Sequence, residues 1–235
     1  MAYGNIEIPQ RLDTAEPLPI LSYGLPSQKA LFTFPLTLKQ TPEELRQVMW
    51  QIFAVEIERG STYPHRGEQS LKDFLNYYYS AGVVIVGIVV GADEAPGKGE
   101  DGAEVKGDGW EGLSIDEVRA GRSWEGCLGG FYYIKPNYPG RSSHNCNAGF
   151  MVNQTQRGLR VGLSLGRSYL IYAPKLGYRA SVFNLVYTNN SASVRIWDSL
   201  GFTRAGLIPE AGLLKKADGS GEEFVDAIVF YKKFE

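Results

Sequence analysis

The chain contains 235 residues, of which 43% are hydrophobic and 21% are charged, and its formal net charge at pH 7 is −2. A chain of this length can bury a full core, and its composition is too apolar for a disordered protein. It lacks the basic charge of nucleic-acid binders and any apolar run long enough to span a membrane. We therefore expect a single globular domain without nucleic-acid or membrane partners. Since its first ten residues resemble no signal or transit sequence, the expected location is cytoplasmic, with a mitochondrial one as the alternative.

The first 40 residues are rich in proline and are expected to be extended and packed at the edge of the protein. A helix follows, because Thr41, Pro42 and Glu44 match a capping box and Gly60 is a typical helix stop. Further elements are predicted as a helix from Ser70, strands at 83–90, 127–134, 145–152, 180–187, 202–208 and 224–231, and helices at 158–173 and 191–200. This order is typical of a mixed α/β fold with one sheet.

Residues 92–124 differ from the rest of the chain. They are rich in glycine and charged residues and poor in apolar ones. Such a segment cannot bury enough apolar surface to offset its ordering entropy. We expect a flexible, acidic surface insertion within one domain that spans residues 1–235.

Residue types that bind metals or form disulfides are scarce. The chain has two cysteines, Cys127 and Cys146, and two histidines, His65 and His144, and neither pair is close in sequence. This spacing excludes a disulfide framework and a thiolate zinc site, so no metal is expected. A free cysteine is most often a packing residue, so Cys146 is expected in the core rather than as a nucleophile.

Residues 156–162, QRGLRVG, place two arginines and two glycines at the expected start of a helix. The N-terminus of a helix offers unpaired N–H groups and the positive end of a dipole, which favour an anion such as phosphate. An ordinary helix start, with small residues that pack on the sheet, is the alternative.

A second pattern lies downstream, where Asn190 is followed by Ser193, Trp197 and the pair Gly201-Phe202. Together with residues 156–162, it resembles the signatures of the GNAT family of acetyl-CoA-dependent N-acetyltransferases. These are R/Q-x-x-G-x-G/A at a helix start and N-x-x-A-x-x-x-Y-x-x-x-G-F after it.

The resemblance extends to a fungal subgroup whose members acetylate proline analogues such as L-azetidine-2-carboxylate. The segments that carry it include 133–138 (YIKPNY), 143–150 (SHNCNAGF), 183–186 (FNLV) and 196–198 (IWD), within roughly residues 52–231. Arg160 stands where the wider family usually has its first glycine, and Trp197 where it often has tyrosine. The subgroup shares both departures.

The resemblance implies an α/β fold with a central twisted, mostly antiparallel mixed sheet, in which two parallel strands splay apart and helices flank both faces. It implies a homodimer that transfers acetyl from acetyl-CoA to the nitrogen of a small amino or imino acid, by direct attack in a ternary complex. A water or a backbone carbonyl would take the proton. A GNAT enzyme for a polyamine, arylamine or peptide, and a non-catalytic acyl-CoA-binding module, are the alternatives.

Particular residues receive roles from the same resemblance. Asn190 would be catalytic, because its side-chain amide would reach the thioester sulfur. Asn147 and the backbone amides of Asn184 and Leu185 would bind the substrate carboxylate. Acetyl-CoA would contact Asn190, the backbone of Phe150, Met151 and Val152, and the pyrophosphate loop formed by Arg157, Gly158, Leu159, Arg160, Val161 and Gly162. The asparagines also have structural readings, as a helix cap for Asn190 and as buried amides for Asn147 and Asn184.

Overall fold

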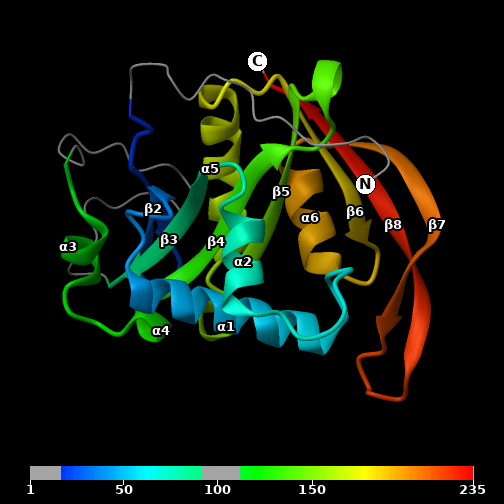
Figure 1. The fold of residues 1–235 in the computed structure, drawn as a ribbon, viewed down its shortest axis with the longest axis horizontal. Helices are drawn as coiled ribbons and strands as arrows, with labels where there is room; N and C mark the ends of the chain where they lie inside the picture. Colours follow the sequence, from blue (N-terminus) through cyan, green and yellow to red (C-terminus); the bar gives the residue numbers. More distant parts are fainter. Residues whose placement is uncertain (1–16, 92–111, 235) are drawn as a thin grey trace.

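The computed structural model describes residues 17–91 and 112–234. Its centre is an eight-stranded sheet in the order β1-β2-β3-β4-β5-β6-β8-β7 (Figure 1). The strands are β1 (Leu21–Leu25), β2 (Lys29–Thr37), β3 (Val83–Val90), β4 (Leu128–Pro136), β5 (Asn145–Val152), β6 (Ala180–Tyr187), β7 (Thr203–Lys215) and β8 (Glu222–Lys233). All neighbours pair antiparallel except β5 and β6, which are parallel. The expected mixed, mostly antiparallel sheet is confirmed.

Helices cover both faces of this sheet. They are α1 (Glu43–Arg59), α2 (Leu71–Tyr78), α3 (Ile115–Arg119), α4 (Trp124–Cys127), α5 (Val161–Lys175) and α6 (Ser191–Ser199). In Figure 1, α1 and α2 lie in front of the central strands and α5 lies behind them. The buried side chains of α6 join those of α5. Because both faces are covered, the central strands are continuous apolar runs, as in β3.

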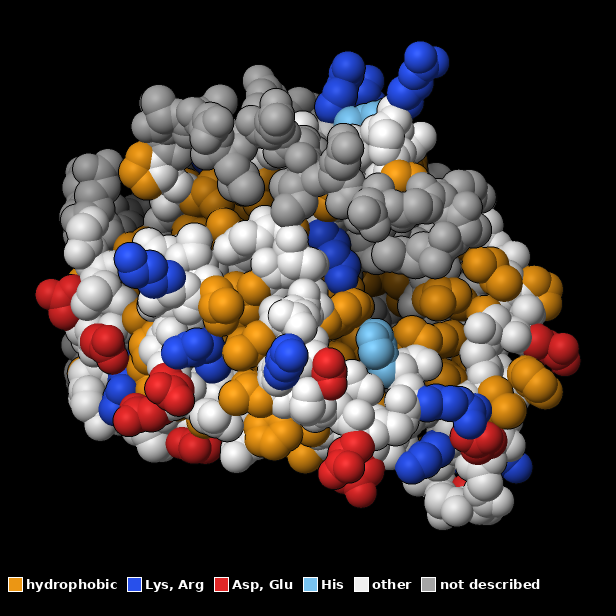
Figure 2. All heavy atoms as spheres, viewed as in Figure 1, with side chains coloured by type: hydrophobic (Ala, Val, Ile, Leu, Met, Phe, Trp, Pro, Cys, Tyr) orange, Lys and Arg blue, Asp and Glu red, His pale blue; other side chains and the backbone are white. Residues whose placement is uncertain are grey.

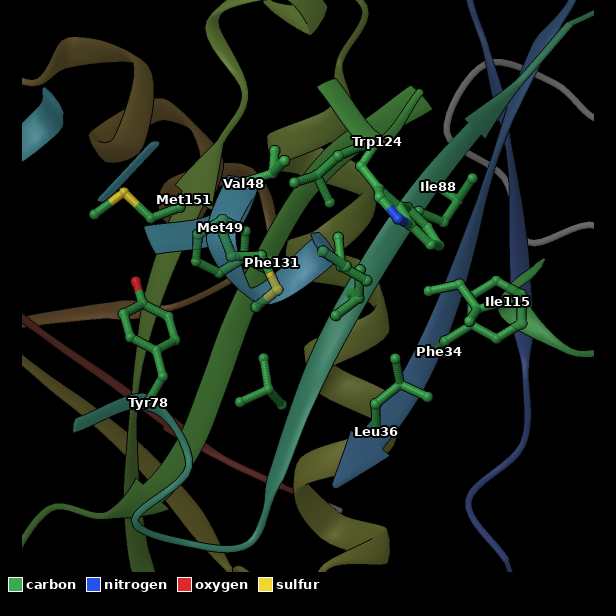
Figure 3. Close-up of a cluster of buried hydrophobic side chains, with 14 of the residues drawn as sticks. Phe34, Leu36, Val48, Met49, Tyr78, Ile88, Ile115, Trp124, Phe131 and Met151 are labelled. Atoms are coloured by element: carbon green, nitrogen blue, oxygen red, sulfur yellow. The ribbon is translucent and has the colours of Figure 1, made fainter. Parts of the chain in front are cut away.

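The core is divided by the sheet into two hydrophobic clusters. In β4, Phe131 and Tyr133 belong to the cluster beneath α1 and α2. Tyr132 and Ile134, which alternate with them, belong to the cluster beneath α5 and α6. Figure 3 shows part of the first cluster, in which Met49 of α1 and Tyr78 of α2 lie over Phe131. This alternation tells which face each site residue of the central strands occupies.

The predicted capping box at the start of α1 is wrong. The helix begins one residue later than the box requires, with Pro42 at the N-cap position and no side-chain cap. The Thr41 hydroxyl instead donates to the carbonyl of Thr37 at 2.9 Å and accepts from Tyr79 Oη at 2.8 Å. The predicted stop is confirmed, since Gly60 adopts a left-handed conformation with φ 66°.

The last part of the region expected to be a flexible insertion, residues 112–124, is folded instead. Residues 92–111 lie outside the described part of the chain. Residues 112–124 contain α3, which Ser114 and Glu117 close with a capping box. Ile115 is buried, and Leu113 and Val118 pack against the first cluster. These apolar side chains anchor α3 to the first cluster.

The last two strands are longer than predicted. Strands expected at 202–208 and 224–231 are parts of a hairpin in which β7 reaches Lys215 and β8 begins at Glu222. The pairing shifts register between Ile208 and Gly212. This irregularity interrupts the alternation on which the prediction relied, so the far half of β7 was missed.

None of the helices in the described ranges is long and apolar enough to cross a membrane. In the same ranges, no three His, Cys, Asp or Glu side chains are grouped so that they could hold a metal ion.

Candidate active site

The sheet opens between its two parallel strands. β5 and β6 pair only at Asn145 with Ala180 and at Cys146 with Ser181. Beyond these pairs the strands diverge, so the remaining edge of β5 toward β6 has no strand partner. The expected splay is confirmed. On the α5 side, Phe150, Phe183 and Trp197 close the opening with ring centroids 4.5–6.3 Å apart.

Past its two pairs with β5, β6 carries a bulge in its pairing with β8. Phe183 pairs with Phe230 of β8, and the next pair joins Val186 to Ile228. Two residues of β6, Asn184 and Leu185, therefore lie opposite a single residue of β8, and the regular pairing of the two strands is interrupted there. A bulge of this kind frees main-chain groups to bind something other than the neighbouring strand.

Asn184 is engaged through its side chain. Its Oδ1 accepts from Asn137 Nδ2 and from Tyr138 Oη, both at 3.1 Å, and its Nδ2 donates to Asn137 Oδ1 at 2.7 Å. The structural reading therefore applies to this side chain, which ties β6 to the turn after β4. Leu185 beside it is 40% exposed. The Asn184 amide is thus already engaged within the protein, so a ligand contact by Asn184 would fall to its backbone.

After β5 the chain passes through a short 3₁₀ turn, η3 (Gln154–Gln156), and reaches α5. The helix begins at Val161, later than the expected residue 158. Gly158 and Arg160 have φ values of 83° and 58°, which helical residues do not adopt. Arg160 at the N-cap position supplies no side-chain cap, so within the described residues the amides of the first turn have no side-chain acceptor.

The side chains of this loop leave its main chain accessible. Val161 is buried and Leu159 half-buried, and both pack in the cluster beneath α5. A Cβ added at Gly158 would meet nothing within 4 Å, whereas one at Gly162 would lie 3.2 Å from Ile196 of α6. The loop thus presents amide groups and the Arg160 cation to solvent, which suits an anion.

Arg157 does not point freely into this loop. Its Nη2 lies 3.3 Å from Oε2 of Glu56, a buried carboxylate of α1. The same carboxylate contacts Arg59 at 3.1 Å and accepts from Thr62 Oγ1 at 2.5 Å. Glu56 was not predicted as a site residue, because its link to the predicted loop is through Arg157, which lies 101 positions away in sequence.

Asn190 is the N-cap residue of α6. Its Oδ1 accepts from the backbone N–H of Ser193 at 3.2 Å. The alternative interpretation of Asn190 as a helix cap is therefore correct for its side-chain oxygen. Within the described residues the Nδ2 group makes no hydrogen bond, so the amide donor is available for a ligand while the oxygen caps the helix.

Asn147 lies on the face of β5 that is turned toward α1 and α2. It is paired directly with Lys135 of β4. The Nζ atom of Lys135 lies 3.7 Å from the ring centroid of Tyr77 and 4.1 Å from that of Tyr133. Burial lowers the pKa of Lys135 to about 8. Sequence reasoning missed this lysine, although a cation at the end of the apolar run in β4 was a usable signal.

A pocket of about 880 Å³ opens on the same face, between α1, the loop after it and the β7–β8 hairpin. Tyr63 and His65 of the loop, Trp50 of α1 and Tyr187 of β6 contribute to its walls. Burial, and secondly the charge of Lys135, lower the pKa of His65. Figure 2 shows this face, where hydrophobic side chains border a hollow.

Cys146 is buried in the core, as expected. Its Sγ lies 3.0 Å from Tyr169 Oη, and burial raises the pKa of the thiol to about 12. A thiol in this state is protonated at neutral pH and is a poor nucleophile.

Comparisons with known proteins show which sequences this chain is similar to. No family model matches the chain. The N-acetyltransferase aca1 of Schizosaccharomyces pombe is 36% identical over 192 residues, which are 82% of this chain and 81% of aca1. The protein SPT10 of Saccharomyces cerevisiae is 28% identical over 96% of this chain, which spans only 37% of SPT10.

Solved structures share the fold. A GCN5-related N-acetyltransferase from Kribbella flavida has a TM-score of 0.61 at 22% identity and covers 86% of this chain and 97% of its own. The yncA protein from Salmonella typhimurium, solved with acetyl-CoA, has a TM-score of 0.59 at 13% identity, with coverages of 86% and 94%. The fold agrees with that of acetyltransferases, and the extent of identity to aca1 decides the family. The chain belongs to the GNAT family of N-acetyltransferases.

Proposed function

We propose that this enzyme transfers acetyl from acetyl-CoA to the ring nitrogen of a small cyclic imino acid of the proline-analogue type. The observation that carries the proposal is the bulge at Asn184 and Leu185 on the β6 side of the opening, with Asn147 on the β5 side just past the last pair of the two strands. Two main-chain donors and one amide side chain, none of them charged, suit a carboxylate held beside the thioester.

The donor side of the opening fits acetyl-CoA. The unpaired edge of β5 at Phe150, Met151 and Val152 would bind the pantetheine arm by strand-like hydrogen bonds. The diphosphate would lie on the amides of the loop and first turn at 157–162, near the Arg160 guanidinium. The yncA protein, which shares the fold, was solved with this molecule.

In the proposed reaction, the acceptor nitrogen attacks the thioester carbonyl directly within the ternary complex. The new N–C bond forms as the C–S bond breaks, and the coenzyme leaves as a thiolate. The Asn190 Nδ2 donor would stabilise the charge that develops on sulfur. The amine proton passes to a water or to a backbone carbonyl, and finally to solvent.

Release of free thiol from acetyl-CoA tests this proposal. Azetidine-2-carboxylate and cis-4-hydroxyproline are expected to be acetylated with far higher kcat/KM than spermidine, an arylamine or a short peptide. Preferential use of one of those three would instead identify a GNAT enzyme of different acceptor class. Calorimetric binding of acetyl-CoA without turnover on any amine would indicate a binding module.

We also propose that the enzyme is a homodimer. β7 is the last strand of the described sheet, and all its residues from Thr203 to Glu210 are exposed. Leu207 and Phe224 are 56% and 62% exposed. A long, exposed and apolar sheet edge is normally covered by another chain or blunted by charges.

A further inference from the structure

Lys135 is a cation without an anionic partner in the described part of the chain. Its ammonium group is half-buried between the rings of Tyr77 and Tyr133 and makes no salt bridge or hydrogen bond there. The two rings attract the charge through their faces but accept none of its three N–H donors. A partly buried ammonium without acceptors is costly, so its presence calls for a ligand that supplies them.

The position of Lys135 indicates which ligand this is. It pairs directly with Asn147 in the β4–β5 ladder. Side chains of such a pair leave the same face of the sheet with Cβ atoms about 4.5–5.5 Å apart. Their face is the one occupied by Tyr133 and by the pocket wall residue Tyr63, which would clash with a side chain at Gly149 of β5. The cation and the amide thus border the acceptor side of the opening.

We propose that Lys135 is the cationic anchor of the acceptor carboxylate, which it binds together with Asn147, and that it selects amino and imino acids over plain amines. This inference rests on the proposed function, because it requires an acceptor with a carboxylate. Two anionic oxygens would satisfy the ammonium donors that the tyrosine rings leave free.

The pKa values of the groups around Lys135 lie outside the range in which Lys135 itself changes charge. The pH therefore tests the contribution of Lys135 to carboxylate binding. Burial raises the pKa values of Tyr63, Tyr77, Tyr78 and Tyr133 above the usual value for tyrosine. Burial and the charge of Lys135 lower the pKa of His65 below its usual value. Lys135, with a pKa of about 8, is then the one member of this cluster that changes charge between pH 7 and 9. Carboxylate affinity should be constant below pH 8 and fall about tenfold per pH unit above it.

Steady-state kinetics with a matched pair of acceptors test the anchor. Azetidine-2-carboxylate and azetidine-2-carboxamide differ in the charge of one group. Lys135→Met should raise the KM of the carboxylate about 10- to 100-fold, the loss expected for a hydrogen bond to a charged group, and should change the KM of the carboxamide less than about threefold. Lys135→Arg, which keeps the charge, should restore most of the affinity for the carboxylate. Lys72→Met, an exposed change on α2, is the matched control.

A ligand that cannot react separates binding from proton transfer. Cyclobutanecarboxylate has the carboxylate but no nitrogen, and it should compete with the acceptor. Its inhibition constant should rise above pH 8 in the wild type and stay flat in Lys135→Met.

The possible outcomes separate the anchor from other roles of Lys135 and from the proposed function. A lower kcat with an unchanged KM for the carboxylate in Lys135→Met would make Lys135 a proton-transfer group instead. Equal losses for carboxylate and carboxamide would assign it a structural role. If the wild type acetylates imino acids and Lys135→Met does so with unchanged KM, the anchor is wrong while the proposed function stands. If linear amino acids are preferred and the variant loses them selectively, the anchor is right and the cyclic substrate is wrong.

Discussion

The side chain of Asn190 holds two polar groups, and only its oxygen has a partner among the described residues, the amide of Ser193. Asn190→Asp keeps the capping oxygen and removes the donor. We expect unfolding free energy within about 0.5 kcal/mol of the wild type, because Asp and Asn are similar N-caps. The kcat should fall about 10²- to 10³-fold, as for the loss of one well-placed donor. Urea denaturation and initial rates measure the two effects, and an unchanged kcat would leave Asn190 as a cap alone.

At the level of single residues, the sequence predicted positions better than contacts. Asn147 and Asn190 were singled out by the family resemblance, and the structure confirms the alternative reading of Asn190 as the cap of α6. The pairing of Arg157 with Glu56 joins residues 101 positions apart. The tyrosine rings around Lys135 likewise come from different elements, α2 and β4. Such contacts depend on how elements are packed, which local patterns do not contain.

Arg160 is both the boundary residue of α5 and a proposed binding residue. Its φ of 58° is the conformation that glycine adopts readily, and it stops α5 from starting earlier. Arg160→Gly should match or exceed wild-type stability by up to about 1 kcal/mol, because the left-handed strain is relieved. Arg160→Ala keeps that strain and should be less stable than Arg160→Gly by about 1 kcal/mol.

Both Arg160 variants lose the guanidinium, so both should raise the KM for acetyl-CoA by a similar factor, about 3- to 30-fold for one charged hydrogen bond at an exposed site. Thermal unfolding and initial rates at varied acetyl-CoA provide the readouts. Wild-type KM values in the two variants would show that the charge does not contact the donor substrate.

At the level of elements, prediction succeeded where a local signal dominated. The helix expected from Ser70 is α2, which begins at Leu71 with Ser70 as its N-cap, and the β-branched run forms β3. It failed where a side chain had a tertiary alternative, as with Thr41, whose hydroxyl bonds Thr37 and Tyr79 instead of capping α1. The composition of residues 112–124 also hid α3, because its burial depends on the distant cluster under α1.

The proposed dimer would be a property of the whole molecule. Leu207 pairs with Ile228, and Phe224 lies four residues before Ile228 on β8, so Leu207 and Phe224 share one face of the hairpin. The wild type should show about twice the 26.0 kDa mass of one chain by light scattering. Introducing lysine at both positions should yield the monomer at micromolar concentration, because like charges would meet across the interface.

Leu38→Lys, a change at another exposed apolar position, should leave the oligomeric state as it is. A wild-type monomer, or a dimer that survives the double substitution, would place the contact elsewhere or remove it.

The two parallel pairs that join β5 to β6 bear on how the protein unfolds. Backbone hydrogen bonds link β1 through β5, and a second set links β6, β8 and β7, but few cross between the two groups. Cooperative unfolding of the two groups of strands therefore depends mainly on contacts between side chains such as Phe150, Phe183 and Trp197. A molecule bound in the opening touches both groups and so strengthens their coupling. Substrates bound in the opening would therefore also stabilise the fold. The enzyme without substrates is expected to be the form most prone to partial unfolding and proteolysis.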